Sequence, residues 1–121
     1  MPDFSLCVWN INGWTQSNAL LRTEIISKYD TDIFCLIDTH RNNHEVAIDV
    51  PHYSCIYHDR QYKHKRAGRA SGGVAVLIKD TITANYTVRE IDNCFEGVLG
   101  LEFTHKISKF VFIVYVCYLP P

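Results

Sequence analysis

The sequence FSLCVWNING, residues 4–13, is an apolar run that ends in oxygen-bearing side chains, and DIFCLIDTH, residues 32–40, repeats this pattern. Both runs predict buried strands, and the helical spacing between them predicts a βαβ unit with parallel strands. The polar ends of parallel strands meet at one sheet edge, where open α/β sheets bind ligands. We therefore expect Asn10, Asn12 and Asp38 to lie within reach of one hard cation, as two amide oxygens and a carboxylate.

The segment between the two runs predicts one helix. Possible N-cap oxygens come from three neighbouring side chains, Thr15, Ser17 and Asn18. Apolar residues recur at every fourth position, and this repeat predicts that the packed face consists of Leu21, Ile25 and Tyr29.

Further strands are predicted at residues 52–57, 73–79, 85–91, 98–103 and 110–118, with a hairpin loop over 104–109. Residues 33–37 and 110–118 are apolar on both faces, so both faces of these strands need cover. We expect one mixed sheet with a covering helix, an α/β (α+β) arrangement whose second face lacks cover from this chain.

The composition indicates one globular domain, because the chain has 121 residues and 47% of them are hydrophobic. No uncharged apolar run reaches the length of a membrane span and no signal sequence is evident, so we expect an intracellular protein, nuclear or cytoplasmic. The odd number of widely spaced cysteines predicts reduced core residues rather than disulfides; they are Cys7, Cys35, Cys55, Cys94 and Cys117.

Charge is unevenly distributed along the chain, although the net charge is only −1. Residues 60–79 carry six bases and no acid, which predicts contact with a polyanion. The candidate nucleic-acid-binding residues are Arg60, Tyr62, Lys63, Lys65, Arg66 and Arg69, with Tyr57 and Tyr62 placed to stack on bases. The alternative is an ordinary solvated loop.

Four motifs in order carry a family resemblance: WNINGW at 9–14, DIFCLIDTH at 32–40, GRASGGVAVLIK at 68–79 and VCYLPP at 116–121. Together they resemble the endonuclease/exonuclease/phosphatase superfamily, and within it the apurinic-type endonuclease domains of non-LTR retrotransposons. The resemblance implies a DNase-I-like αββα sandwich, of which residues 1–121 form the N-terminal part of a single domain, without a second domain.

The resemblance also implies roles for individual residues. Asp38 stands at the position of the acidic residue that binds catalytic Mg²⁺ or Mn²⁺, where glutamate is usual, and Asn12 stands where aspartate is usual. Asn10 matches the asparagine that orders the metal and the phosphate, and Tyr118 matches a tyrosine that binds the scissile phosphate. Both departures imply a weakly bound metal.

Simpler interpretations stay open for several of these residues. Asn12-Gly13 is a typical turn dipeptide, Asp38 can merely end a strand, and Tyr118 can be an ordinary strand tyrosine. His40 and His44 have the spacing of a zinc clamp on a helix, although no third ligand is nearby.

The function implied is a truncated metal-dependent phosphodiesterase domain, ancestrally a DNA-nicking endonuclease. Whether the chain is an active enzyme stays open, because the family's Asp-x-Asn and terminal Asp-His motifs do not occur in it. The alternatives are a non-catalytic nucleic-acid or protein interaction module, and a superfamily enzyme acting on a lipid or RNA. The expected partners are DNA and either a missing C-terminal half or a second copy bound through the uncovered sheet face, and no membrane.

Overall fold

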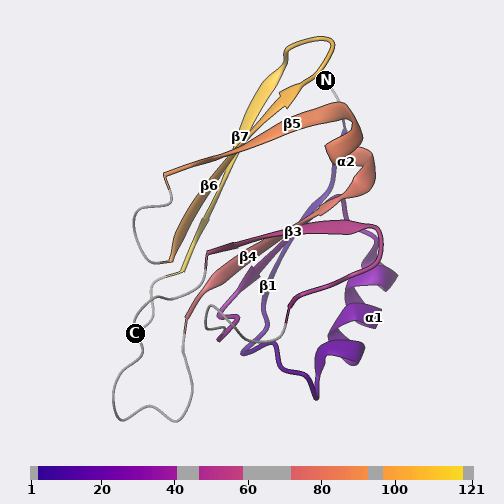
Figure 1. Cartoon of the computed structure of the whole chain (residues 1–121), viewed down its shortest axis with the longest axis vertical. Coiled ribbons are helices and arrows are strands. Elements are labelled where there is room, and N and C mark those ends of the chain that lie inside the picture. Colours follow the sequence, from indigo (N-terminus) through magenta and orange to yellow (C-terminus); the bar gives the residue numbers. More distant parts are fainter. Residues whose placement is uncertain (1–2, 41–46, 59–71, 93–96, 119–121) are drawn as a thin grey trace.

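The computed structural model describes residues 3–40, 47–58, 72–92 and 97–118. In chain order the elements are β1 (Leu6–Asn10), α1 (Ala19–Tyr29), β2 (Ile33–Ile37), β3 (Tyr53–His58), β4 (Val74–Lys79), α2 (Asp80–Asn85), β5 (Tyr86–Ile91), β6 (Val98–His105) and β7 (Val111–Cys117). The strands form two sheets, which Figure 1 shows with α1 beside the lower one. Neither of the helices in these ranges has the length and apolar character needed to cross a bilayer.

The first sheet, sheet A, has the strand order β1-β2-β4-β3. β1 and β2 are parallel, with Leu6 opposite Ile33 and Asn10 opposite Ile37, while β4 runs antiparallel to both β2 and β3. The predicted βαβ unit is therefore confirmed. The parallel register also brings the last residues of β1 and β2 to the same edge.

One face of sheet A packs against α1. Alternate residues of β2 and β4 point toward the helix, among them Phe34, Leu36 and Leu77, and they enclose Ile26 of α1, which is fully buried. The predicted packed face of α1 is wrong, because Leu21 is 59% and Tyr29 68% exposed. The N-cap residue of α1 is Asn18, which is one of the three predicted candidates. Its side chain makes no capping hydrogen bond and instead accepts a hydrogen bond from the N–H of Thr15.

The opposite face of sheet A packs against a second sheet, sheet B, with the order β5-β6-β7. Ile33 and Cys35 of β2 share this inner core with Leu101 and Phe103 of β6, and all four are at most 2% exposed. The expectation of one mixed sheet without a second layer is thus corrected: the chain supplies its own second sheet. The inter-sheet core explains why β2 is apolar on both faces.

Two smaller differences concern the helix α2 and the cysteines. The sequence pattern predicts no helix at Asp80–Asn85, whereas in the structure these residues form α2, which joins β4 to β5 and so links the two sheets. Cysteines within the described ranges are free thiols, as predicted, and Cys35 lies in the core. Cys117, by contrast, is exposed, and Cys94 lies outside the described residues.

Candidate functional site

Three chain segments meet at the edge where β1 and β2 end. Backbone pairing continues beyond both strands, because the N–H of Gly13 donates to the carbonyl of Asp38 and that of Trp14 to Thr39, each over 2.8 Å. The loop before β4 closes the group, since the N–H of His40 donates to the carbonyl of Gly72 over 2.9 Å. The edge is therefore held by backbone hydrogen bonds before any side chain contributes.

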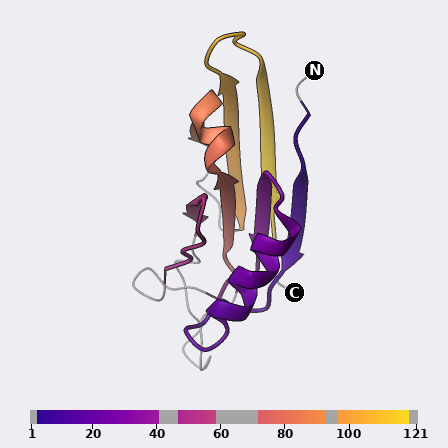
Figure 2. The same ribbon diagram turned by 90° about the vertical axis from the view of Figure 1, so that its right-hand side faces the viewer.

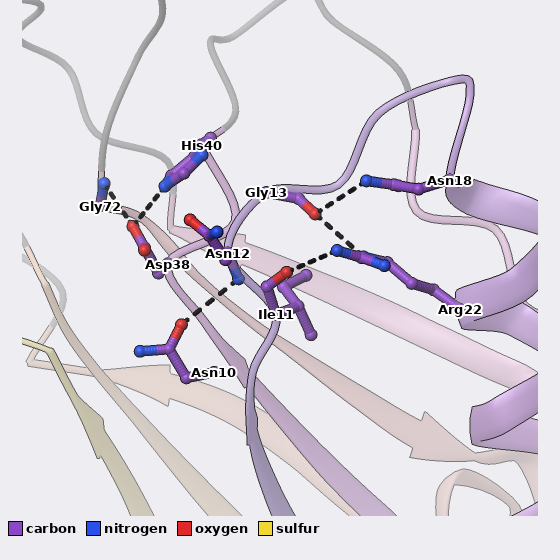
Figure 3. A network of polar contacts seen from close by, with 9 residues as sticks. All are labelled: Asn10, Ile11, Asn12, Gly13, Asn18, Arg22, Asp38, His40 and Gly72. Atoms are coloured by element: carbon purple, nitrogen blue, oxygen red, sulfur yellow. Dashed lines mark hydrogen bonds and ion pairs between the residues drawn. The ribbon is translucent and has the colours of Figure 1, made fainter.

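Asp38 lies at the centre of this edge (Figure 3). Its Oδ1 is 2.8 Å from Nε2 of His40 and accepts a hydrogen bond from the N–H of Gly72 over 3.0 Å. The Asp38 side chain is 13% exposed, and its φ of 60° places it in the left-handed region. A left-handed residue right after β2 breaks the strand alternation and turns the carboxylate into the cluster instead of continuing the sheet.

Asn10 and Asn12 lie at the same edge, as predicted, and both are exposed. Oδ1 of Asn10 accepts from the N–H of Asn12 over 3.3 Å, so one amide oxygen is already used within the turn. The φ angles of 47° at Asn12 and 96° at Gly13 confirm that this dipeptide forms a turn. Asn12 therefore forms a turn and also lies beside Asp38, as Figure 3 shows.

Arg22 is a residue of this edge that the sequence analysis did not single out. From α1, its Nε donates to the carbonyl of Gly13 over 3.0 Å and its terminal nitrogen to the carbonyl of Ile11 over 2.7 Å. Its guanidinium also lies 5.7 Å from the ring centroid of Trp9. Arg22 thus holds the turn that contains Asn12 in place. No sequence motif predicts hydrogen bonds of this kind, from a side chain to backbone carbonyls.

His40 is the second residue whose role differs from the sequence expectation. It pairs with Asp38, and its side chain is only 7% exposed. The zinc alternative joined it to His44, which lies outside the described residues. Gly13 packs directly on the imidazole, because a Cβ at that position would stand 2.9 Å from Nδ1 of His40.

Several buried polar atoms of this edge have no hydrogen-bond partner among the described residues: Trp14 Nε1, Thr39 Oγ1 and His40 Nδ1. Buried polar groups are usually paired, so this concentration is unusual for a purely structural turn. Two of the three belong to the segment that follows Asp38. The edge therefore has the unsatisfied polar character that is typical of functional sites.

The donor atoms at this edge fit a weakly held hard cation. Mg²⁺ is commonly bound through one or two carboxylates, with water and substrate phosphate completing the shell. Asp38 offers one carboxylate and Asn12 one amide oxygen, while Oδ1 of Asp38 is shared with His40 and Gly72. No cluster of three or more His, Cys, Asp or Glu side chains suited to a metal occurs in the described part of the chain.

The remaining candidate residues are placed less directly. Tyr118 follows β7, where its ring packs against the inner core and its N–H donates to the carbonyl of Gly97 over 2.7 Å. Its role at a phosphate stays a prediction. Tyr57 is not placed for stacking on bases, because it packs in the helix-side core and its hydroxyl bonds the backbone of Ile48. The basic run, Arg60, Tyr62, Lys63, Lys65, Arg66 and Arg69, lies outside the described residues.

Comparison with known proteins gives two matches. Residues 7–120 match the Endonuclease/Exonuclease/phosphatase family. The crystal structure of the AP endonuclease LMAP from Leishmania major aligns with 97% of this chain at a TM-score of 0.74 and 18% sequence identity. The alignment confirms the DNase-I-like fold, and the chain spans 40% of the length of that protein. No curated protein sequence matches the chain.

Proposed function

This chain belongs to the Endonuclease/Exonuclease/phosphatase family, and we propose that it forms the metal-binding part of a phosphodiesterase domain that acts on DNA. Membership supports a nuclease or phosphodiesterase type of domain. The DNA substrate, the metal and an origin among retrotransposon endonucleases are the proposed refinements. The chain would be the N-terminal part of one domain, in keeping with the 40% of the Leishmania enzyme that it spans.

The observation that carries this proposal is the group formed by Asp38, Asn10 and Asn12 at one edge of sheet A. Its carboxylate is held in place by His40 and the N–H of Gly72, and the facing turn is held by Arg22. Preorganised polar groups at the carboxyl end of parallel strands are the usual setting for ligand chemistry in α/β folds. The unpartnered polar atoms beside Asp38 support the same site.

Asp38 and Asn12 would hold Mg²⁺ or Mn²⁺, with Asn10 ordering the turn between them. Such a cation supplies charge neutralisation to a phosphate that gains negative charge during hydrolysis. Asp38 contributes the one carboxylate, His40 limits the directions in which it can turn, and Tyr118 would donate its hydroxyl to a phosphate oxygen. The shorter side chain of aspartate and the neutral Asn12 both make the metal weakly bound.

DNA affinity measured with and without Mg²⁺ tests the proposal. We expect Mg²⁺ to tighten binding of a labelled DNA duplex about tenfold relative to EDTA, the effect of one charge-assisted contact. Asp38→Ala should remove this metal-dependent gain. Glu24→Ala is the matched control, since it deletes an exposed carboxylate of α1. Equal metal dependence in wild type and Asp38→Ala would contradict the site, and metal-independent binding would favour a non-catalytic binding module.

The DNA contact itself is assigned to the basic run of residues 60–69. If the run neutralises about four phosphates, a plot of the logarithm of the binding constant against the logarithm of the salt concentration should have a slope of about −3.6. The triple change Lys63→Ala, Lys65→Ala and Arg66→Ala should flatten this slope by about 2 to 3 units. Fluorescence anisotropy across a salt series measures both slopes. Binding that ignores salt, or a slope unchanged in the triple variant, would rule out this contact.

A further inference from the structure

The two carboxylate oxygens of Asp38 have different surroundings. Nε2 of His40 lies 2.8 Å from Oδ1, and the N–H of Gly72 donates to the same oxygen over 3.0 Å, as Figure 3 shows. Within the described part of the chain, Oδ2 has no hydrogen-bond donor. The structure therefore leaves Oδ2 as the oxygen of Asp38 that is available to a cation.

Asp38, His40 and Gly72 form a closed ring of contacts at this edge, which lies at the lower end of β1, the indigo strand on the right of Figure 2. The N–H of His40 donates to the carbonyl of Gly72 over 2.9 Å, and the N–H of Gly72 donates to the Asp38 side chain. Asp38 and His40 both have positive φ angles, 60° and 57°, which turn the chain back on itself. Rotating the carboxylate to exchange its two oxygens would break both contacts to Oδ1.

The surroundings of His40 decide which of its ring nitrogens carries a proton. Nε2 must be protonated, because a bare lone pair 2.8 Å from a carboxylate oxygen would face the lone pairs of that oxygen. Nδ1 is buried and has no hydrogen-bond partner among the described residues. It packs against Gly13, where a Cβ would stand 2.9 Å away, so a proton on Nδ1 would have no acceptor. The imidazole therefore acts on Asp38 through the N–H of Nε2.

We propose that His40 is a specificity-determining residue, which restricts Asp38 to binding through one oxygen and so favours Mg²⁺ and Mn²⁺ over Ca²⁺. The inference rests on the proposed function in one respect, namely that Asp38 holds the cation. Ca²⁺ takes about six to eight oxygen ligands and often binds both oxygens of a carboxylate. Mg²⁺ requires an octahedral shell and keeps several waters, and Mn²⁺ also takes octahedral oxygen sites. Occupying Oδ1 therefore removes a contact that Ca²⁺ uses and Mg²⁺ does not need.

The small number of oxygen donors at this edge supports the same selectivity. Asp38 offers Oδ2 and Asn12 one amide oxygen, while Oδ1 of Asn10 already accepts a hydrogen bond from the N–H of Asn12. Mg²⁺ is commonly bound through one or two carboxylates with water completing its shell, so few protein donors suffice for it. Ca²⁺ has a larger shell and would depend on water for most of it.

A purely structural role for His40 predicts a different result from a selective one. If the imidazole only filled the space behind Asp38, its replacement would weaken the binding of every divalent cation by a similar factor. If the imidazole occupies Oδ1, its replacement frees this oxygen and improves the binding of Ca²⁺ relative to Mg²⁺. Selectivity is a difference between two affinities, so the ratio of the Ca²⁺ and Mg²⁺ affinities distinguishes the two roles.

Displacement of bound Mn²⁺ by Mg²⁺ or Ca²⁺, followed by electron paramagnetic resonance of the released ion, measures this ratio. In wild type, Ca²⁺ should displace Mn²⁺ no better than Mg²⁺ does. His40→Leu, which keeps the bulk and removes the N–H, should shift the ratio about tenfold toward Ca²⁺. His40→Gln can again present an N–H to Oδ1 and should restore most of the wild-type ratio. The control His52→Leu removes an exposed imidazole at the opposite end of sheet A and should behave like wild type.

Nitrogen NMR of the isotopically labelled wild-type chain without metal is an independent test, and it holds even where circular dichroism shows that His40→Leu does not fold. We expect a proton on Nε2 of His40 and none on Nδ1, and the reverse would overturn the inference. So would a wild type that releases Mn²⁺ more readily to Ca²⁺ than to Mg²⁺, or a ratio that His40→Leu leaves unchanged. These outcomes leave the proposed metal site standing, whereas a wild type that holds no Mn²⁺ would contradict the proposed function and this inference with it.

Discussion

β1 and β2 are neighbouring parallel strands of similar apolar character, yet they differ sharply in burial. Every residue of β2 from Ile33 to Leu36 is at most 2% exposed, whereas β1 alternates between exposed and partly buried positions. β2 lies between α1 and sheet B, while β1 has α1 only partly over one face and none of the described strands packed over the other. Burial therefore follows from the strand's neighbours and not from its composition.

The same two strands end together in the polar edge that carries Asp38. Asp38 follows the buried strand and is itself largely buried, while Asn10 and Asn12 follow the exposed strand and are exposed. The site thus has a buried, rigidly held side at Asp38 and a solvent-accessible side at Asn10 and Asn12. Rigid support on one side and access on the other is what a site for a charged ligand requires.

The largest predicted difference between β1 and β2 is in their contribution to stability. Leu36→Ala on β2 should lower the free energy of unfolding by about 3 kcal/mol, because Leu36 is 0% exposed and its removal leaves a cavity. Leu6→Ala on β1 deletes the same atoms at a position that is 45% exposed, so it should cost less than about 1.5 kcal/mol. Urea denaturation at low protein concentration measures both. Equal losses would show that the two strands are equally covered.

A second, smaller effect concerns the turn after β1. Gly13→Ala should destabilise the chain by about 1–3 kcal/mol, because φ is 96° there and a Cβ would press on His40. The neighbouring Asn12→Gly relaxes a left-handed residue and should change the free energy of unfolding by less than about 0.5 kcal/mol. Thermal unfolding of the two variants measures both changes in stability. A Gly13→Ala variant as stable as wild type would mean that the turn and His40 are loosely packed.

The last predicted difference is in the reactivity of two cysteines, one on the buried strand β2 and one on the exposed strand β7. Burial, followed by the nearby Cys7, raises the pKa of Cys35 to about 11. At pH 8 only about one part in a thousand of this thiol is ionised, so iodoacetamide should modify exposed Cys117 well before Cys35. Mass spectrometry of timed samples follows both sites. Early labelling of Cys35 would show that the inter-sheet core opens.

The raised pKa also links Cys35 to stability in alkali. Its thiol stays protonated in the folded chain while it ionises in the unfolded chain between about pH 9 and about pH 11. The stabilising contribution is therefore complete below this window and is lost as the pH rises through it. Cys35→Ser, whose hydroxyl does not titrate there, should show a flatter stability profile over the same range.

The sequence predicted the βαβ unit and the meeting of Asn10, Asn12 and Asp38 because both follow from strand direction alone. It did not predict the partners of Asp38. The bonds from His40 and Gly72 depend on left-handed turns and on a loop distant in sequence, which strand patterns do not encode. Arg22 was missed for a similar reason, since its acceptors are backbone carbonyls.

Two fold features were predicted wrongly, each for a physical reason. Residues spaced by four drift about 40° per step around a helix, so the repeat of Leu21, Ile25 and Tyr29 turns away from the side on which Ile26 is buried. An apolar strand signals that both faces need cover but not what supplies it, so sheet B was not foreseen as the second layer. Among the described strands, large apolar side chains stay exposed on β1 and on the outer face of β7.

We propose that Asp38 holds a divalent cation at the edge where β1 and β2 end, and a titration with Mn²⁺ followed by electron paramagnetic resonance is the direct test of this claim. We predict weak, saturable binding of one ion by wild type and by Glu24→Ala. Asp38→Ala should weaken this binding by about tenfold or more, the effect of losing one charged ligand. Binding of equal strength in Asp38→Ala, or no binding by wild type, would contradict the claim.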